Sequence, residues 1–454
     1  MPKRSNKRKP GKSGKPSKPK SLSIPEALKA AIQLQRTAQL DDAETLYRRI
    51  LQAVPEQPDA LHFFGVLHHQ KGKTQEAAEL IRRSLAINPK NAGAHSNLGN
   101  VLKELKQFAE AETAYREAIA LEPGLADAHN NLGTMLRLQN KSEEAVSAYR
   151  QAIELAPKHA DAYHNLGNAL VGLREFDEAV EIYRQAIRLN PGQGKTYERL
   201  GMALYRLGRS DEAIAVFRQW QQADPLNLTA KHLLAACSGE DVPTRASDQY
   251  VEELFDRLAT SFDDHLHELE YHAPELVGAL VAEQYPDPAQ KLTVLDAGCG
   301  TGLAAQMLRP YAERLVGVDL SAGMLDQARD RGGYDELVRA ELTAYLEQCA
   351  ASTFDLIVSV DTLVYFGDLR DFLNAAAITL KDQGRLIFTV EQAEGAVETD
   401  QGYRLNPHGR YSHAEPYLRQ TLEHAGLTVR AIRGETLRLE GGWPVAGWLV
   451  LAEK

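Results

Sequence analysis

The chain has 454 residues, a net charge of −10, and hydrophobic and charged contents of 43% and 25%, as expected of a folded protein with two or three domains. No apolar run approaches the roughly 18 residues that a membrane-spanning helix needs, so we expect no membrane span. The three cysteines lie far apart and form no C-x-x-C pair. Their pattern favours the reducing cytoplasm and makes a disulfide framework a poor expectation.

The first segment is a basic tail. Residues 1–20 contain nine Lys or Arg and no acid, which leaves a net charge of −19 for the rest of the chain. Because residues 1–22 lack the apolar content for a core, we expect them to be disordered. The tail is suited either to RNA or another acidic partner, or simply to solubilising the chain. It is the only part of the sequence that suggests contact with nucleic acid.

Residues 23–238 repeat with a period of 34. Six prolines stand on this period, at positions 55, 89, 123, 157, 191 and 225. Glycines recur at 65, 99, 133, 167 and 201, and alanines at 43, 77, 111, 145, 179 and 213. This pattern resembles tetratricopeptide repeats, each unit being two helices that bury their apolar faces only when units stack. The resemblance implies an all-α solenoid of six units, closed by a last helix over Thr229–Cys237, and a protein or peptide partner.

Three asparagines share one position of this repeat. Asn97, Asn131 and Asn165 each precede Leu-Gly, and the series stops at Phe63 and Arg199. They resemble the asparagine ladder of the O-linked N-acetylglucosamine transferase repeats, whose amides hold an extended peptide. An amide has both donors and an acceptor, which suits binding to a peptide backbone. The alternative is that these are polar residues used in helix packing.

A polar linker over 239–248 leads to a segment, 250–284, that predicts two or three helices broken near Tyr271–Pro274. Histidines and acids are close together in this segment: His265, His267 and His272 beside Asp263, Asp264 and Glu268. A metal site is disfavoured because residues two apart do not share a helix face. These residues are otherwise candidates for a lid over a ligand, or for plain surface.

The sequence Asp296-Ala-Gly-Cys-Gly-Thr-Gly302 follows an apolar strand over 292–295 and precedes an expected helix over 303–311. Glycines there let a ligand touch the main chain. A second strand ends in Asp319, where a carboxylate reaches ribose hydroxyls in such sheets. The glycine spacing is G-x-G-x-G, not the G-x-G-x-x-G of dinucleotide folds. These two motifs resemble class I S-adenosylmethionine-dependent methyltransferases.

The segment that begins at Phe262 has the sequence F-D-D-H-L-H-E-L-E-Y-H-A-P-E-L. It is similar to bacterial predicted methyltransferases that carry tetratricopeptide repeats. The resemblance implies a class I methyltransferase domain over 249–454 with a Rossmann-like, seven-stranded sheet and an antiparallel closing hairpin. It implies S-adenosyl-L-methionine as cofactor and a set of cofactor-binding residues. They are Asp296, Gly298, Gly300, Gly302, Asp319, Leu320, Met324, Glu341, Leu342 and Asp361.

The last third of the chain continues this fold. Strands are expected at 337–340, 354–360 and 384–390, and a hairpin over 428–439 and 443–451. A long polar connection over 391–412 lies at the carboxyl end of the fifth strand, which is the ligand side. It makes Arg404, Arg410, Tyr411 and His413 substrate-side candidates.

Methyl transfer needs an acceptor held in line with the methyl group and, for a neutral acceptor, removal of its proton. Our candidates for catalytic residues are Tyr365, Tyr411 and His413. The sequence after the fourth strand is V-D-T-L rather than N-P-P-Y, which disfavours an amide or nucleobase nitrogen. Three functions remain: a methyltransferase whose repeats recruit a protein substrate, a small-molecule methyltransferase whose repeats dock or oligomerise it, and a scaffold without activity.

Overall fold

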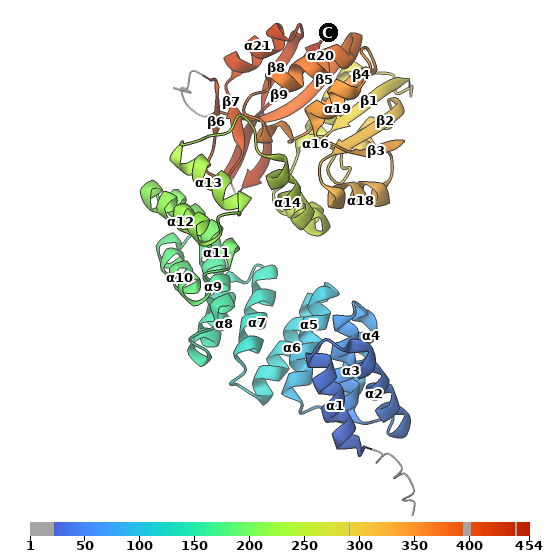
Figure 1. Cartoon of the computed structure of the whole chain (residues 1–454), viewed down its shortest axis with the longest axis vertical. Helices are drawn as coiled ribbons and strands as arrows, with labels where there is room; N and C mark the ends of the chain where they lie inside the picture. The colour runs from blue at the N-terminus through green and yellow to red at the C-terminus, as the bar shows by residue number, and fades with distance from the viewer. Residues whose placement is uncertain (1–21, 290, 394–400, 441–442) are drawn as a thin grey trace, which may run out of the picture. The chain divides into compact units, whose positions relative to one another are not determined.

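The computed structural model describes residues 22–289, 291–393, 401–440 and 443–454. The chain divides into two compact units, Met1–Leu173 and Arg174–Lys454, and each is described by itself (Figure 1). The predicted basic tail lies outside the described residues, Leu22 excepted, as does the glycine pair of the predicted closing hairpin. The predicted domain limits at 238/239 and 248/249 stay a prediction.

The first unit is all-helical. Paired helices of 13 and 14 residues alternate along it, as the 34-residue period predicts. The helices are α1 (Ile24–Arg36), α2 (Leu40–Ala53), α3 (Pro58–Gln70), α4 (Thr74–Ile87), α5 (Ala92–Glu104), α6 (Phe108–Leu121), α7 (Ala126–Leu138), α8 (Ser142–Leu155) and α9 (Ala160–Gly172).

The repeated glycines have a packing role. A Cβ on Gly99 would lie 2.6 Å from the ring of Tyr115, and one on Gly133 would lie 2.8 Å from the ring of Tyr149. Both tyrosines are fully buried. A glycine on the first helix of a repeat therefore makes room for the large residue on the second, which explains why the two recur with one period.

The second unit begins with helices of the same pattern. They are α10 (Phe176–Leu189), α11 (Gly194–Arg206), α12 (Ser210–Ala223) and α13 (Leu228–Ser238). Helix α13 is the predicted closing helix, and its N-terminus is capped by Asn227, whose side chain accepts from the Ala230 N–H at 2.9 Å.

The remainder of this unit is an α/β domain. Its helices are α14 (Asp248–Leu258), η1 (Ala259–Ser261), α15 (Phe262–Glu268), α16 (Ala273–Gln284), α17 (Ala305–Leu308), α18 (Ala322–Arg331), α19 (Leu342–Gln348), η2 (Leu363–Tyr365), α20 (Arg370–Thr379) and α21 (Glu415–His424). Its strands are β1 (Leu292–Ala297), β2 (Ala312–Asp319), β3 (Glu336–Arg339), β4 (Phe354–Ser359), β5 (Leu380–Gln392), β6 (Tyr403–Leu405), β7 (Tyr411–His413), β8 (Thr428–Glu440) and β9 (Trp443–Glu453).

The strands form one mixed sheet. Strands β3, β2, β1, β4 and β5 pair in that order and run parallel, and β9 pairs antiparallel with both β5 and β8. This is the predicted doubly wound sheet with its closing hairpin. Because β1, β2, β4 and β5 are parallel, their carboxyl ends meet at one edge, where ligands bind in such sheets.

Alternate strand residues bury into two separate cores. Leu295 and Ile357 face a core with α19, α20 and α21, whereas Val294 and Leu356 face a core with α16 and α17. The period of two along each strand thus produces three layers, helix–sheet–helix.

Two predictions of local structure were wrong. The segment over 391–412 was expected to be a long connection, but it contains β6 and β7, which raise the sheet to nine strands within the described residues. These strands have only three residues each, too few for a period-two pattern to show. The helix expected over 303–311 is limited to α17, because the glycine loop continues in turns to Ala304.

Candidate active site

The glycine loop after β1 leaves space beside one of its glycines. Gly298, Gly300 and Gly302 have φ values of 84°, 53° and 85°, a region that favours glycine. A Cβ on Gly298 would lie 2.1 Å from Oγ1 of Thr362, but one on Gly300 would meet nothing within 4 Å. The main chain at Gly300 therefore borders open space at the ligand edge of the sheet.

Asp319 joins the end of β2 to this loop. Its Oδ2 accepts from the Gly300 N–H at 2.9 Å, and its Oδ1 accepts from the Ser321 N–H at 2.9 Å. Burial raises the pKa of this carboxyl, which the backbone hydrogen bonds partly offset. Asp319 thus holds the loop while each of its oxygens keeps a lone pair for a further donor.

Asp296 is buried at the end of β1, where the glycine loop begins. It is 1% exposed, and its Oδ2 accepts from the Tyr334 hydroxyl at 2.6 Å. Burial raises the pKa of Asp296 to about 7, with Tyr334 lowering it and Asp319 raising it further. The Tyr334 ring in turn packs against Gly302 and Gly317. Asp296 therefore supports the loop, and a direct role in cofactor binding stays a prediction.

The other predicted cofactor residues surround this edge. Leu320 lies two residues before α18, the buried Met324 lies in the first turn of α18, and the buried Leu342 starts α19. Glu341 is the N-cap of α19 and accepts from Thr343 N at 3.1 Å and Ala344 N at 2.8 Å. Its carboxylate is therefore already engaged with the main chain, and its predicted adenine contact stays untested.

Helices α14 and α15 bind the ligand edge through carboxylates. Asp256 of α14 accepts from the Ser321 hydroxyl and from the Gly323 N–H at 3.0 Å. Asp263 of α15 accepts from the Thr301 hydroxyl at 2.6 Å and pairs with Arg331. These bonds hold the two helices on the glycine loop and on the start of α18, and a role for them as a lid stays a prediction.

The described side chains of α14 and α15, like the rest of the described residues, form no metal site. Among the side chains that the structure describes, no group of three His, Cys, Asp or Glu residues is placed to hold a metal ion. Asp263 is occupied by Thr301 and Arg331, so the metal alternative for this histidine-rich segment gains no support.

A cluster of charged side chains occupies the carboxyl ends of β4 and β5 and the end of β8. Arg438, 2% exposed, is at its centre. Its Nη1 lies 2.7 Å from Oδ2 of Asp361, its Nε lies 2.9 Å from Oε1 of Glu440, and its Nη2 pairs with Glu391. All three guanidinium nitrogens are therefore engaged with carboxylates.

Arg410 closes this charged cluster from the start of β7. Its Nε lies 2.6 Å from Oε1 of Glu391, and it also pairs with Glu440. Burial alone would raise the pKa of Glu440, but Arg410 and Arg438 outweigh burial and lower that pKa to about 2. Burial, with Arg410 nearby, lowers the pKa of His408 to about 4, so this imidazole is neutral at pH 7. We call Asp361, Glu391, Arg410, Arg438 and Glu440 the charge cluster.

Of the predicted catalytic residues, Tyr365 borders the charge cluster. It lies within electrostatic reach of Arg410 and Asp361, and burial raises its pKa to about 12. Tyr411 is fully buried and donates to the carbonyl of Pro243 at 2.7 Å. His413 is fully buried beside the Gly367 carbonyl, 3.0 Å from Nε2, and burial lowers its pKa to about 4. These placements favour packing roles for Tyr411 and His413, and their catalytic roles stay untested.

Sequence reasoning missed Arg438, Glu391 and Glu440. They lie near the ends of strands that read as ordinary sheet, and no motif marks them. The sequence does show charged residues at or just past the ends of three strands. To see that these strand ends meet at one edge of the sheet, one must know the strand order, which the sequence alone does not give.

Residues 295–388 match the family described as Methyltransferase domain. Malonyl-[acyl-carrier protein] O-methyltransferase of Salmonella typhimurium is 28% identical over 42% of this chain and 72% of its own length. The enzyme of that name from Enterobacter lignolyticus is 30% identical over 41% of this chain and 70% of its own. The chain belongs to the methyltransferase family.

This methyltransferase also carries repeats that match known families. Residues 91–158, 124–191 and 164–227 match Tetratricopeptide repeat families, and residues 36–118 match a family described as Anaphase-promoting complex, cyclosome, subunit 3. A solved structure of Pseudomonas aeruginosa pilF covers 47% of this chain and 96% of its own, with 20% identity and a TM-score of 0.42. That score is too low to support a functional comparison.

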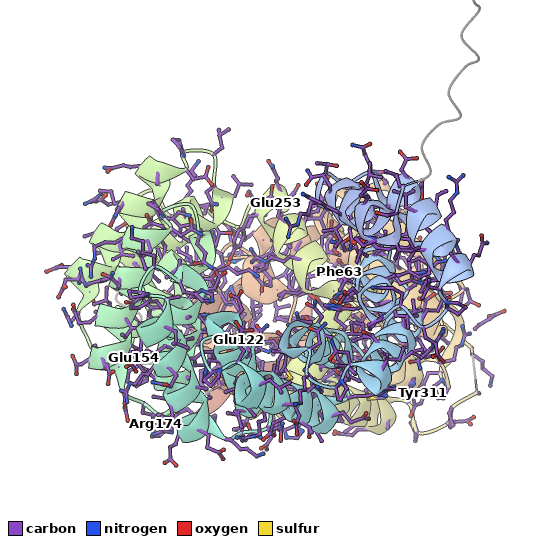
Figure 2. The ribbon with its side chains drawn as sticks, turned by 90° about the horizontal axis from the view of Figure 1, so that it is seen from below. Phe63, Glu122, Glu154, Arg174, Glu253 and Tyr311 are labelled. Carbon is purple, nitrogen blue, oxygen red and sulfur yellow. The ribbon has the colours of Figure 1, made fainter. Side chains whose placement is uncertain are left out.

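The three predicted asparagines of the methyltransferase's repeats bond to the preceding repeat. Nδ2 of Asn97 lies 2.8 Å from Nε2 of His62, and Nδ2 of Asn131 and Asn165 donate at 3.0 Å to Oδ1 of Asn100 and Asn130. All three asparagines are half-buried. They therefore form a polar row across the first helices of successive repeats. One repeat earlier the same position is Phe63, which Figure 2 labels.

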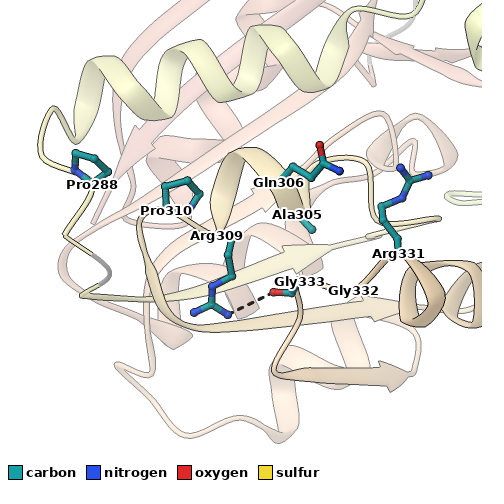
Figure 3. A pocket seen from close by; sticks show the side chains of 8 residues that line it. All are labelled: Pro288, Ala305, Gln306, Arg309, Pro310, Arg331, Gly332 and Gly333. Atoms are coloured by element: carbon teal, nitrogen blue, oxygen red, sulfur yellow. Dashed lines mark hydrogen bonds between the residues drawn. The ribbon is translucent and has the colours of Figure 1, made fainter.

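A surface pocket of about 500 Å³ lies against α17 and the end of α18 (Figure 3). Its two cations are already engaged: Arg309 pairs with Asp335 at 2.6 Å, and Arg331 donates to the Thr301 carbonyl at 2.8 Å. We therefore assign the methyltransferase's ligand edge to the glycine loop and not to this pocket. None of the helices that the structure describes combines the length and apolar character needed to cross a membrane.

Proposed function

We propose that this methyltransferase takes its methyl group from S-adenosyl-L-methionine and that its repeats recruit a protein or peptide substrate. The arrangement of Gly300 and Asp319 supports the cofactor most directly. An open main-chain position beside a carboxylate suits a nucleoside that carries hydroxyls, and family membership agrees with it. The free thiols of Cys237, Cys299 and Cys349 support a cytoplasmic location.

The residues of the edge fit this cofactor. Gly300 presents no side chain to it, and Asp319 retains lone pairs for ribose hydroxyls. When bound, S-adenosyl-L-methionine supplies a methyl group on a cationic sulfur that needs no acid to leave. The protein's task is then to exclude water and to orient the acceptor.

Aromatic side chains of the lid serve that task. The ring of Phe255 lies 5.4 Å from that of Tyr365 and 5.8 Å from that of Phe262, both nearly edge-on. Phe255 and Phe262 come from α14 and α15, whose carboxylates are bonded to the loop and to α18. The lid thus places apolar surface beside the charge cluster, where Tyr365 is positioned to orient an acceptor.

The asparagine row tests recruitment by the repeats. Full-length protein is incubated with methyl-tritiated S-adenosyl-L-methionine and a soluble extract of the source cells, and label in protein is measured. Replacing Asn97, Asn131 and Asn165 together by Ala is expected to lower that label at least about tenfold, since three amide contacts of roughly 0.5–1.5 kcal/mol each are lost.

A matched control carries Ala at Arg83, Glu117 and Gln151, exposed residues that share one repeat position on the second helices. This control is expected to methylate as the wild type does. Circular dichroism checks that both variants keep their helices. Protein methylation that survives in the asparagine variant contradicts recruitment through this row.

The similarity to known methyltransferases favours a second candidate function, methylation of a small molecule. The two relatives named above act, by their names, on malonyl-[acyl-carrier protein], a small acid attached to a protein. A small acyl or similar acceptor would leave the repeats to dock or oligomerise the enzyme. The asparagine variant separates the two functions, because methylation of a small molecule by that variant would be unchanged.

A further inference from the structure

Asp361 lies two residues after the end of β4, and only one of its two carboxylate oxygens has a hydrogen-bond partner. Its N–H donates to the Thr389 hydroxyl at 2.8 Å, and its Oδ2 lies 2.7 Å from Nη1 of Arg438. Its Oδ1 is buried and has no hydrogen-bond partner. Its φ of 54° is left-handed, a region that non-glycine residues adopt uncommonly. Strain and an unpaired buried oxygen in one residue are typical of a functional position.

Two phenols near Asp361 also lack partners. The Tyr271 and Tyr365 hydroxyls have no hydrogen-bond partner among the described residues, and both rings lie within electrostatic reach of Asp361 and Arg438. Hydrogen bonds from His272 N to the Leu437 carbonyl and from Leu439 N to the Leu269 carbonyl place Tyr271 beside Arg438. Three polar groups with unused capacity thus border the same place.

This place adjoins the glycine loop. The next residue, Thr362, would be struck by a Cβ on Gly298, and its hydroxyl lies 3.2 Å from the Gly298 carbonyl. Asp361 therefore directly precedes, in the chain, a residue that contacts the glycine loop. It lies at the same sheet edge as the site assigned to the cofactor.

The charge cluster contains more carboxylates than cations. Asp361, Glu391 and Glu440 face only Arg410 and Arg438, which gives a formal charge of −1. The Nε, Nη1 and Nη2 atoms of Arg438 are all engaged. A carboxylate acceptor would meet three carboxylates here and would find Arg438 already paired, so like-charge repulsion disfavours it.

We propose that the acceptor is a hydroxyl or an amine, not a carboxylate, and that Oδ1 of Asp361 accepts its hydrogen bond and then its proton. The inference rests on the proposed methyl transfer and names its acceptor class. In the reaction a bond forms from the acceptor oxygen or nitrogen to the methyl carbon, and the carbon–sulfur bond breaks with its electron pair on sulfur. The acceptor's proton goes to Asp361, and Tyr271 and Tyr365 orient the acceptor.

The first test needs no knowledge of the substrate. Wild-type full-length protein labels a soluble extract of the source cells from methyl-tritiated S-adenosyl-L-methionine, and the product is treated with alkali. Methyl esters of carboxylates release volatile methanol under these conditions, whereas methyl ethers and methylamines do not. We expect the label to stay in the product; release of most of it as methanol overturns the inference.

The second test replaces the proton acceptor. Asparagine has nearly the same shape as aspartate and also tolerates a left-handed backbone conformation, but its amide cannot take a proton. Labelling by Asp361→Asn should therefore fall about 100-fold or more. The family resemblance places Asp361 among the cofactor-binding residues, whereas this proposal gives its free Oδ1 to the acceptor and its Oδ2 to Arg438. The variant's affinity for S-adenosylhomocysteine, measured by calorimetry, should therefore stay within about threefold of wild type. The control is Glu283→Gln. Glu283 is an exposed residue of α16 that pairs with Arg433 of β8, and this variant should match wild type in labelling and in affinity.

The outcomes are distinct. Asp361→Asn labelling at the wild-type rate, or losing the cofactor product's affinity in step with its activity, contradicts the role of Asp361. No labelling by wild-type protein contradicts the proposed function itself, and the acceptor class with it.

Discussion

Asp296 shows how burial sets the chemistry of a single carboxyl. An aspartate in water has a pKa near 4, whereas burial at the end of β1 raises the pKa of Asp296 to about 7. A raised pKa means that the folded state holds the proton more tightly than the unfolded state. The stability linked to this proton is therefore fully present below pH 4 and is lost as the pH rises to about 7.

This linkage predicts a difference between wild type and Asp296→Asn. The free energy of unfolding of wild type should fall relative to the variant between pH 5 and pH 7, by at most about 3 kcal/mol, and the difference should be flat above pH 8. Urea unfolding across this range measures it. Tyr334→Phe, which removes the hydrogen bond that lowers the pKa, should move the loss to higher pH. A difference independent of pH would show that Asp296 is ionised throughout.

At the scale of the element, the glycine loop separates structural from ligand-facing positions. Gly298 and Gly300 both have positive φ, so alanine at either position costs about 1 kcal/mol of backbone strain. Only at Gly298 does the new Cβ also collide with Thr362, at 2.1 Å. The two substitutions are therefore matched in strain and differ in packing.

We expect Gly298→Ala to lower the melting temperature more than Gly300→Ala, because only the first must displace Thr362. Gly300→Ala should instead weaken S-adenosyl-L-methionine binding about tenfold or more, since its methyl group occupies the ligand's space. Thermal unfolding and calorimetry measure the two effects. Equal affinity of Gly300→Ala and wild type would mean that the ligand does not lie on this side of the loop.

Prediction from sequence succeeded where one element carries its own signal. The 34-residue period fixed the solenoid helices because glycine and tyrosine occupy matched positions, as Gly99 and Tyr115 do. The loop around Gly300 was recognisable because its three glycines at alternate positions form a motif within one short stretch of sequence. The charge cluster was not, since Asp361, Arg438 and Glu391 are brought together by strand order. The short strands β6 and β7 were missed for lack of length.

At the scale of the whole molecule, the unit from Arg174 to Lys454 joins the last repeat helices to the α/β domain. Nε2 of His232, on α13, lies 2.8 Å from the Gly409 carbonyl oxygen. The His232 ring stacks on the Tyr250 ring, with 4.3 Å between ring centroids. Gly409 precedes Arg410 of the charge cluster. Ala236 of α13 packs in one cluster with Tyr411. Helix α13 therefore positions the β6–β7 hairpin, which carries Arg410 of the charge cluster.

These contacts predict how fragments of the chain behave. Residues 249–454 match the predicted methyltransferase domain but lack His232, Ala236 and the Pro243 carbonyl that Tyr411 binds. In this fragment Tyr250 and the β6–β7 hairpin lose buried contacts worth roughly 2 kcal/mol. We therefore expect its melting temperature to lie at least about 5 °C below that of residues 174–454. Equal melting temperatures would support the sequence boundary at 248/249 as the physical one.

The most direct test of the whole account is calorimetric titration of S-adenosyl-L-methionine and S-adenosylhomocysteine into full-length wild type and Asp319→Ala. The account predicts micromolar binding to wild type and a loss of about tenfold or more in Asp319→Ala, whose fold is retained, since the carboxylate that bonds Gly300 and faces the ribose is gone. Unchanged affinity in Asp319→Ala would contradict the site. No binding to wild type would contradict the cofactor and leave a repeat scaffold with a methyltransferase fold.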